Sequence, residues 1–555
     1  MKNIGLKRIG ALALTACLAA SALAGCSGGA QSGGAAGSAA PSAPQKETLR
    51  IGIFAAGREE SPSAPGEYID DNWSTRYIIK NFAEPNNIDL KYEIIDDTND
   101  AGTQNLQTLM ASKSAPDLFY VVSGDAGIVA EYAQEGALTD LQPALDKNGS
   151  HIKSLIGEDF IKKNGTFSGK LYSIPGKEDI PAISHYWIRQ DWLDTLHLSM
   201  PANFDEWYSV MKAFKDRASE LAAAGRVAKA EDVIPYAMYH TKYYTDWERI
   251  VTRFYPTEFF DPKKASYYID SGYGTEYLKT GFKDGMQFMN QMYNEGLISK
   301  NFALDTDDKQ FQRDIVSGNA GSYCDNLFNG WGPSDPESWQ SLLAKNIPGA
   351  KFEFVNPFTN KYDGVARNPL DNPVLTYVMV PSFSKSADAA VKYLDYVSVP
   401  DNLVTIQYGE KDVSYIVDPV LGPMLKDDDA LKAWGHMLGG RELVMLKRLP
   451  DAKWARIQRS GAKTADEAAY AEKIHQAIEE NGYERFPGVL AESDVKSQME
   501  NLRTPWQQFV SDLIMAKPGQ FDAAWTKGTK ELEANGSLTV VEGYKKTVKE
   551  QLGIE

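Results

Sequence analysis

The 555-residue sequence contains only three cysteines, at positions 17, 26 and 324. So few thiols exclude a disulfide framework, and a large hydrophobic core therefore has to stabilise the folded chain. The chain also lacks an excess of positive charge, because 58 Lys and Arg stand against 75 Asp and Glu, for a net charge of −17. This acidity disfavours nucleic-acid binding, since phosphates require clustered cations. The 11 Trp, 28 Tyr and 22 Phe exclude a mainly disordered chain.

Long apolar runs are almost absent. The single run, Ile9–Ala24, follows the cations Lys2, Lys7 and Arg8. It is short for a membrane span, which needs about 20 residues, and its layout predicts a secretory signal peptide over residues 1–25. Without a second such run, the sequence excludes a polytopic membrane protein.

The end of the signal peptide carries a second motif. Leu23-Ala24-Gly25-Cys26 resembles the bacterial lipobox, which implies cleavage before Cys26 and a diacylglycerol group on its sulfur. Two or more acyl chains are enough for stable membrane anchoring. After Cys26, residues 27–45 contain only Gly, Ala, Ser, Pro and Gln, so residues 26–45 are predicted to be a flexible tether. Cys324 then remains as the one thiol of the folded part, and its strand-like context predicts burial.

Apolar runs and amphipathic segments alternate from Lys46 onward, which predicts an α/β fold with mainly parallel sheets flanked by helices. The predicted strands are 49–55, 88–94, 117–122, 171–175, 183–189, 319–324 and 375–380. Helices are predicted at 126–135, from Asn203 onward, at 387–397, and through most of the chain after Asp427. Asn203 and Glu206 have the spacing of a capping box.

Several ordered motifs resemble the family-1 extracellular solute-binding lipoproteins of ABC importers, and most closely their long oligosaccharide-uptake branch in Gram-positive bacteria. These motifs are the lipobox and tether, Ala115–Leu118, Gln134–Leu138, Gly169–Pro175, Trp187–Leu193, Phe204–Trp207, Gln407–Glu410 with Tyr415, and Trp525–Gly536. Each motif is weak alone, but their order along residues 46–555 is specific.

The resemblance implies a two-lobed, type II periplasmic-binding-protein-like fold that closes by a hinge around a ligand. Lobe one would comprise residues 46–183 with a segment after about 375. Lobe two would comprise 184–373 with C-terminal helices from 420–555. The chain would cross near 182–184 and again near 374–377. The calcium loop of long-branch relatives is not recognisable in residues 215–235, so no metal is predicted.

Signatures of catalysis are missing as well. None of the six histidines is spaced for a zinc site, and neither a Gly-x-Ser-x-Gly elbow nor a phosphate-binding Gly-rich loop is present. No catalytic residue and no cofactor are therefore predicted. Paired carboxylates for glycoside hydrolysis are too common in an acidic chain to be informative.

A sugar site needs flat aromatic surfaces together with planar amide, carboxylate or guanidinium groups. In α/β lobes such groups lie in loops beyond the carboxyl ends of strands. Three loops and one strand fit, and they supply the candidates Asn72, Trp73, Asp125, Trp187, Asp325, Asn326, Asn329 and Trp331. For Trp73 the alternative is packing at a helix start, for Asp125 a helix cap, for Trp187 a buried strand, and for the loop from Asp325 to Trp331 an ordinary surface loop. Trp247 lies in a helical apolar stripe that favours the core, and Arg367 and Asn368 are weaker candidates.

Together, these features predict a monomeric receptor anchored by lipid to the outer face of the cytoplasmic membrane of a Gram-positive bacterium. It would capture a solute, an oligosaccharide in the first instance, and deliver it to an ABC permease without being an enzyme. Two alternatives stay open: a surface-anchored glycan hydrolase or lyase, and a binding protein for a peptide or polyamine.

Overall fold

The computed structural model describes residues 46–61, 64–123, 126–180, 184–239, 247–261, 274–305, 307–326, 331–426, 440–484 and 493–552. Residues 46–555 form one compact unit. Within the described ranges, no helix combines the length and apolar character that a membrane crossing requires.

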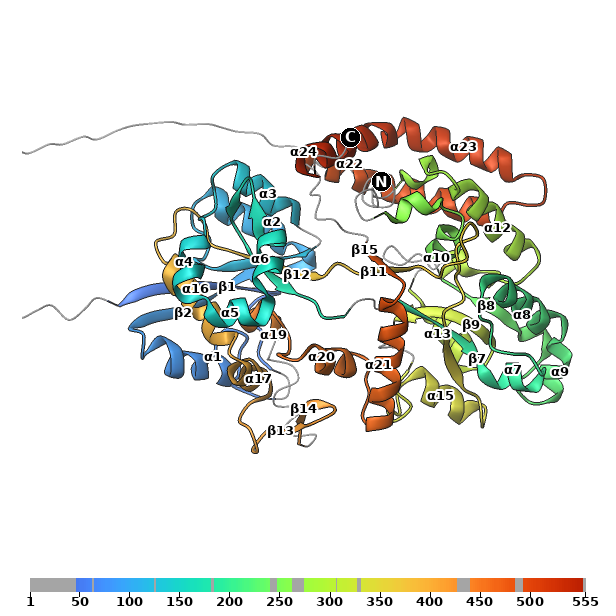
Figure 1. Cartoon of the computed structure of the whole chain (residues 1–555), viewed down its shortest axis with the longest axis horizontal. Helices are drawn as coiled ribbons and strands as arrows, with labels where there is room; N and C mark the ends of the chain where they lie inside the picture. The colour runs from blue at the N-terminus through green and yellow to red at the C-terminus, as the bar shows by residue number, and fades with distance from the viewer. Residues whose placement is uncertain are drawn as a thin grey trace, which may run out of the picture. The chain divides into compact units, whose positions relative to one another are not determined.

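The first sheet is built from strands that are far apart in the sequence (Figure 1). Strands β1 (Glu47–Ala55) and β2 (Ile88–Asp96) pair in parallel along their full length. A parallel bridge between Ile51 and Leu118 connects β1 to the segment that opens β3 (Phe119–Val122). Strand β12 (Val374–Met379) then pairs antiparallel with both β3 and β6 (Ile174–Lys177).

These strands are apolar on both faces because helices cover both sides of the sheet. Alternate residues of β3 and β12 enter two different hydrophobic clusters, with Tyr120 and Val378 in one and Val121 and Tyr377 in the other. We call these two clusters together the first core. The helices around it are α1 (Trp73–Ile78), α2 (Gly102–Ala111), α3 (Ala126–Gln134), α4 (Gln142–Asn148), α5 (Ser150–Ile156), α6 (Glu158–Gly165), α16 (Ala387–Val397), α17 (Pro400–Tyr408) and α19 (Gly440–Val444).

The second sheet has the strand order β10–β7–β9–β8. Its strands are β7 (Ser184–Arg189), β8 (Ile234–Ala237), β9 (Ala320–Asn326) and β10 (Phe352–Val355). Only β8 and β9 pair in parallel, while β7 is antiparallel to both β9 and β10. The expectation of mainly parallel sheets is therefore corrected to mixed sheets, although the α/β class holds.

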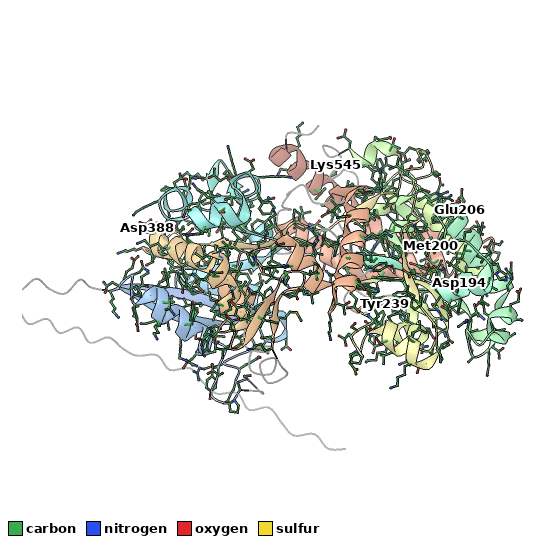
Figure 2. The ribbon with its side chains drawn as sticks, turned by 60° about the horizontal axis from the view of Figure 1, so that its bottom comes forward. Asp194, Met200, Glu206, Tyr239, Asp388 and Lys545 are labelled. Carbon is green, nitrogen blue, oxygen red and sulfur yellow. The ribbon has the colours of Figure 1, made fainter. Side chains whose placement is uncertain are left out.

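Helix α8 (Phe204–Asp216) packs on the second sheet as its sequence predicts. Phe204, Trp207 and the other apolar residues of its stripe are buried, and the Asn203 side chain accepts a hydrogen bond from the Glu206 backbone. The carboxylate of Glu206 lies at the exposed surface, as does Asp194 in α7 (Gln190–Thr195) (Figure 2). Further helices of this part are α9 (Ala218–Ala223), α10 (Glu248–Thr252), α12 (Phe282–Asn294), α13 (Lys309–Val316) and α15 (Trp339–Asn346).

The C-terminal region is mainly helical, as predicted, and contributes to both faces of the second sheet. Its long helices α22 (Ser493–Ile514), α23 (Phe521–Ala534) and α24 (Ser537–Leu552) share one cluster with Trp207 and Tyr236, and α21 (Ala465–Glu479) enters another with Trp187 and Tyr323. We call these two clusters the second core. The remaining elements are α20 (Ala452–Arg459) and the strand pairs β4 (Thr166–Phe167) with β5 (Lys170–Leu171), β11 (Asn368–Leu370) with β15 (Gly482–Glu484), and β13 (Tyr415–Asp418) with β14 (Gly422–Leu425).

Of the two crossings predicted from the sequence, the one near 182–184 lies mostly outside the described residues, and the one near 374–377 falls in β12. A third passage between the two cores, which the sequence did not predict, follows Leu446. Leu446 belongs to the first core and accepts a hydrogen bond from the backbone of Lys177 at 2.7 Å. The next residue, Lys447, forms a buried ion pair with Asp179, with Nζ and Oδ2 3.0 Å apart. The chain then continues through α20 into α21 of the second core.

Candidate functional site

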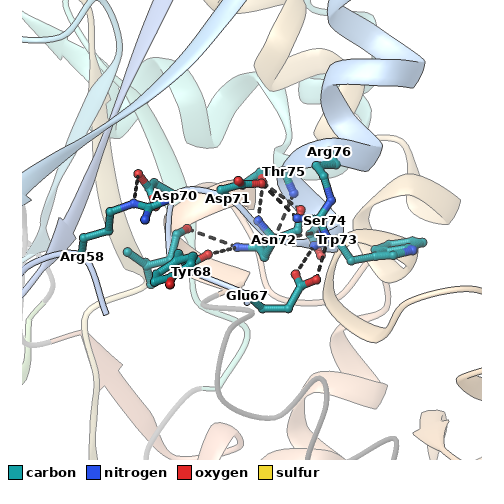
Figure 3. A network of polar contacts seen from close by, with 11 residues as sticks. Arg58, Glu67, Tyr68, Asp70, Asp71, Asn72, Trp73, Ser74, Thr75 and Arg76 are labelled. Carbon is teal, nitrogen blue, oxygen red and sulfur yellow. Dashed lines mark hydrogen bonds and ion pairs between the residues drawn. The ribbon is translucent and has the colours of Figure 1, made fainter. Parts of the chain in front are cut away.

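The loop after β1 ends in a helix cap built on Asn72 (Figure 3). Its Oδ1 accepts hydrogen bonds from the backbone of Ser74 and Thr75, at 3.0 and 3.1 Å. Its Nδ2 donates to the backbone oxygens of Tyr68 and Ile69, at 3.0 and 3.2 Å. Because the amide has two donor hydrogens and two acceptor positions, these contacts use its full capacity. Asn72 is buried and positions the residue that follows it.

That residue, Trp73, presents a half-buried indole at the first turn of α1. The ring stacks on Tyr77, with centroids 5.0 Å apart and planes at 15°. In Figure 3 the indole points away from the polar network, while the backbone nitrogen of Trp73 donates to Glu67 at 2.7 Å. A flat aromatic face of this kind suits the C–H face of a sugar ring.

Charged side chains beside Trp73 are fixed by ion pairs. Arg58 contacts both oxygens of Asp70, at 2.9 and 3.0 Å, and this hydrogen bonding raises the pKa of the Arg58 guanidinium. Arg76 bridges Glu67 at 2.5 Å and Asp71 at 2.9 Å. Planar guanidinium and carboxylate groups are therefore paired with one another in the loop after β1, and the Trp73 indole points away from them (Figure 3).

A second group of candidates lies on one face of the second sheet. The antiparallel register of β7 and β9 places His185 opposite Asp325 and Trp187 opposite Tyr323. Strand β10 places Phe354 opposite Trp187 from the other side. Because side chains alternate along a strand, these residues share a face. The His185 ring centroid is 6.5 Å from that of Trp187 and 6.2 Å from that of Phe354.

Helix α21 covers this face with further aromatic side chains. The His475 ring centroid is 5.9 Å from that of His185, with the rings nearly perpendicular. Tyr470 stacks on Trp331, with centroids 5.1 Å apart. The Tyr470 hydroxyl donates to Glu353 at 2.5 Å and accepts from a backbone nitrogen of β10 at 3.0 Å. Trp331 is thereby attached to the same hydrophobic cluster as Trp187.

We call His185, Trp187, Phe354 and His475 the indole–imidazole cluster. Among the described residues, Trp187 Nε1 is buried without a hydrogen-bond partner, and the imidazole of His475 is buried beside the backbone carbonyl of Arg456. Burial, reinforced by the nearby Arg456 guanidinium, lowers the pKa of His475 to about 4, while Glu472 and the Arg456 carbonyl act in the opposite direction. At neutral pH the imidazole is therefore uncharged, with one donor and one acceptor nitrogen.

Two cations beside this cluster are already paired. Arg456 contacts both carboxylate oxygens of Glu472, at 3.0 and 3.1 Å. Arg189, which follows Trp187 on the same face of β7, contacts both oxygens of Asp191 at 2.8 Å. The described residues contain no group of three or more His, Cys, Asp or Glu side chains able to hold a metal ion.

The predicted candidates thus divide between two places. Trp187, Asp325 and Trp331 come together at the second sheet, and Asn72 and Trp73 lie at the start of α1. Asp125, Asn329 and the lipidation residue Cys26 lie outside the described residues, and only the backbone of Asn326 is described.

Four other residues have a clearer outcome. Burial is confirmed for Cys324 and Trp247, which are 4% and 3% exposed. The weaker candidate Arg367 pairs with Asp363 and lies over an aromatic ring, and Asn368 is buried in β11.

Sequence reasoning missed His185, Tyr470 and His475. His475 had a signal, because it extends the apolar stripe Ala471–Ile474–Ile478 of an otherwise charged helix. His185 stands two residues before Trp187 in a strand, the spacing that puts both on one face. Tyr470 carried no distinguishing pattern.

Known proteins resemble this chain over part of its length. It is 26% identical over 217 residues to the Bacillus subtilis lipoprotein LipO, covering 39% of this chain and 40% of that protein. It is 27% identical over 267 residues to the polygalacturonan/rhamnogalacturonan-binding protein YtcQ of the same organism, covering 46% of this chain and 47% of the relative. The chain thus spans less than half the length of both curated relatives.

Solved structures extend the likeness to nearly the whole chain. An HMO-binding, ABC-transporter-associated solute-binding protein from Bifidobacterium longum infantis superposes with a TM-score of 0.63 at 16% identity, covering 91% of this chain and 99% of that one. At this identity the likeness shows the fold, which is the two-lobed, type II periplasmic-binding-protein-like fold. The profile of the bacterial extracellular solute-binding proteins matches residues 67–403, more than half of the sequence. This chain therefore belongs to the bacterial extracellular solute-binding protein family.

Proposed function

We propose that this protein is a surface lipoprotein that captures an oligosaccharide and delivers it to an ABC permease, without chemical conversion of the solute. The observation that carries the proposal is the Trp73–Tyr77 stack, an aromatic surface at the start of α1, directly after a loop that carries paired guanidinium and carboxylate groups. This combination suits a ligand with apolar ring faces and many hydroxyls.

Relatives support this assignment. Their names describe binding of polygalacturonan and rhamnogalacturonan, of HMO, and of fructooligosaccharide. In the proposed arrangement, lobe one contains residues 46–183 and the segment after about 375, and lobe two contains 184–373 with the C-terminal helices. The grouping of β12 and α16 with β1, and of α22–α24 with β7, supports this division. Cys26 would carry the lipid that holds the protein at the outer face of the membrane.

Thermal unfolding with a broad panel of oligosaccharides tests the binding function. A ligand that binds only the folded protein stabilises it, by about 2.7 kcal/mol at a concentration 100 times its Kd. We expect at least one glycan to raise the Tm and to give heat in calorimetry. A panel without any response would contradict sugar binding.

A variant locates the binding surface. Trp73→Ala should weaken glycan binding at least tenfold because it removes the stacking face, and Tyr362→Ala, at an exposed tyrosine on a surface turn, serves as the control.

Chromatography of glycans incubated with the protein distinguishes the enzyme alternative. Unchanged substrates are expected, and new products would contradict a purely binding role.

A further inference from the structure

The three passages between the two cores are bonded to one another beside the first sheet. The first passage follows β6, the second precedes β12, and the third follows Leu446. The backbone of Glu178 in the first passage donates a hydrogen bond to Pro373 in the second, at 2.8 Å. The buried ion pair of Asp179 and Lys447 joins the first passage to the third. The three chain segments therefore run together at this point.

Helix α21 receives the second passage on the side of the second core. Strand β11, which leads into the second passage, pairs in parallel with β15, which follows α21. The backbone nitrogen of Asn368 in β11 donates to the carbonyl of Asn481 at 3.0 Å. Its side-chain amide donates to the carbonyl of Ile478, in the last turn of α21, at 3.4 Å. The carboxyl end of α21 is thus fixed to the second passage.

The third passage is fixed to the same helix by charge. Arg456 of α20 contacts both carboxylate oxygens of Glu472 in α21, and the two side chains are 19% and 12% exposed. The hydrogen bond to Glu472 raises the pKa of the Arg456 guanidinium against the effect of burial, and the charges of Glu479 and Asp179 raise it further. The carboxylate of the first passage therefore also acts on Arg456.

The opposite side of α20 is bound to the first core. Gln458 donates to the carbonyls of Leu421 and Pro423 in the β13–β14 hairpin, at 3.2 and 2.6 Å. The Tyr408 hydroxyl at the end of α17 donates to the same side chain at 2.7 Å. Figure 1 shows α20 between α17 and α21. The Arg456–Glu472 pair therefore joins the third passage to the second core.

We call Asp179, Lys447, Arg456 and Glu472 the passage charges. They are two cations and two anions, and they come from the first passage, the third passage, α20 and α21. A rotation of the passages that separated the partners would leave buried charges uncompensated, which is costly in a medium of low polarity. The passage charges therefore favour one orientation of α21 relative to the passages.

The orientation of α21 also matters for the candidate site at the second sheet. This helix carries His475 of the indole–imidazole cluster, and it carries Tyr470, which stacks on Trp331 and donates to Glu353. One helix thus contacts both the passages and the aromatic face of the second sheet.

We propose that the passage charges form a hinge clasp, which holds α21 at one angle to the three passages and restricts the rotation of the two lobes in the solute-free protein. A hinge is a small number of residues at element ends that absorb a change in backbone angles, and three bonded passages provide such a place. The inference goes beyond the proposed function because it concerns the protein without solute.

Distances between two spin labels, measured by pulsed electron paramagnetic resonance, test the clasp. The labels are placed by Lys392→Cys on α16 and Lys345→Cys on α15, both exposed positions. The chain used begins at residue 27, so that it lacks Cys17 and Cys26 and keeps the whole compact unit. A sample without the two substitutions measures any labelling of the buried Cys324.

Two variants open the clasp at α21. Arg456→Met removes the cation and retains an unbranched side chain, and Arg456→Met with Glu472→Met leaves no unpaired charge at this position, so the double variant retains the fold. We expect both to broaden the distribution of label distances roughly twofold, because a hinge without its ion pair adopts a wider range of angles.

The matched control is Arg50→Met, which breaks an ion pair with Asp117 inside the first lobe. Its side chains are 29% and 12% exposed, comparable with those of Arg456 and Glu472. It should leave the width of the distance distribution unchanged. An unchanged width in both Arg456 variants overturns the inference, and so does equal broadening by Arg50→Met. No sugar is present, so either outcome leaves the proposed function to be decided by the glycan panel.

Discussion

At the scale of single residues, two adjacent candidates in the loop after β1 have different environments. Asn72 and Trp73 stand next to each other, and both have the chemistry of a sugar site. The amide of Asn72 is used entirely by the backbone around it, whereas the indole of Trp73 is half-buried and stacks on Tyr77. An N-cap preference is visible in a sequence, but the choice between capping and ligand contact depends on the loop that folds around it.

Asn72→Ala should therefore lower the free energy of unfolding by about 2 kcal/mol, the upper range for loss of a helix N-cap. The change removes the acceptor for two backbone N–H groups and the donor for two backbone carbonyls. Thermal or urea denaturation measures the effect. Asn81→Ala, at an exposed position a few residues along the same helical segment, is the matched control and should stay within about 0.5 kcal/mol. Equal effects of the two substitutions would contradict the structural role of Asn72.

His475 makes stability depend on pH. Its pKa is lowered to about 4 in the folded protein, against about 6.5 in an unfolded chain. The unfolded state therefore takes up the proton first as the pH falls. The stability associated with the neutral imidazole is complete above pH 6.5 and is lost progressively down to pH 4, by about 3 kcal/mol. His475→Leu should remove this part of the slope, so the free energy of unfolding of the variant, measured relative to that of the unmodified protein, should rise by about 3 kcal/mol as the pH falls from 6.5 to 4. Parallel curves would contradict the assignment.

At the scale of elements, the local sequence pattern predicted which segments form strands and which form helices. It did not predict whether neighbouring strands run parallel or antiparallel. The runs at 49–55 and 88–94 form strands, and the amphipathic segment 387–397 forms α16 with the predicted bounds. Apolar runs indicate burial on both faces, which parallel and mixed sheets share. The antiparallel course of β12 is set by where the chain returns from the second sheet, and no local pattern encodes that return.

Three elements pack closely around Gly176 in β6. A Cβ atom there would stand 2.3 Å from Thr376 Oγ1 and 2.9 and 3.0 Å from the backbone oxygens of Met445 and Leu446. Backbone atoms cannot rotate away, so Gly176→Ala should lower the free energy of unfolding by about 1–3 kcal/mol. Gly52→Ala is the control, because the nearest atom there is the terminal methyl of Ile95, and a smaller loss is expected. The decrease in Tm of the two variants is compared by thermal unfolding. A larger decrease for Gly52→Ala than for Gly176→Ala would contradict the proposed packing.

At the scale of the whole molecule, the two-lobed organisation was predicted from the family resemblance. Composition excluded other classes of protein but did not predict two lobes. The third passage between the cores was not predicted because residues 440–447 look like any short segment of mainly apolar residues. Their role depends on two contacts with residues about 270 positions earlier in the chain. Leu446 accepts a backbone hydrogen bond from Lys177 of β6, and Lys447 forms an ion pair with Asp179. Contacts of such sequence separation leave no periodic signal in one sequence.

The Asp179–Lys447 pair should therefore be a major determinant of stability where the passages meet. Both side chains are buried, at 6% and 7% exposure, so removal of one partner leaves an uncompensated charge. We expect Asp179→Asn or Lys447→Met alone to cost about 3–5 kcal/mol, and the double variant to cost less than the sum of the two. Urea denaturation of the four proteins completes the cycle. Lys147→Ala, which breaks an exposed pair with Asp388, should change stability by about 1 kcal/mol or less. Additive effects at Asp179 and Lys447 would show that the two charges do not stabilise each other, and that the third passage is held by its backbone hydrogen bonds and apolar contacts instead.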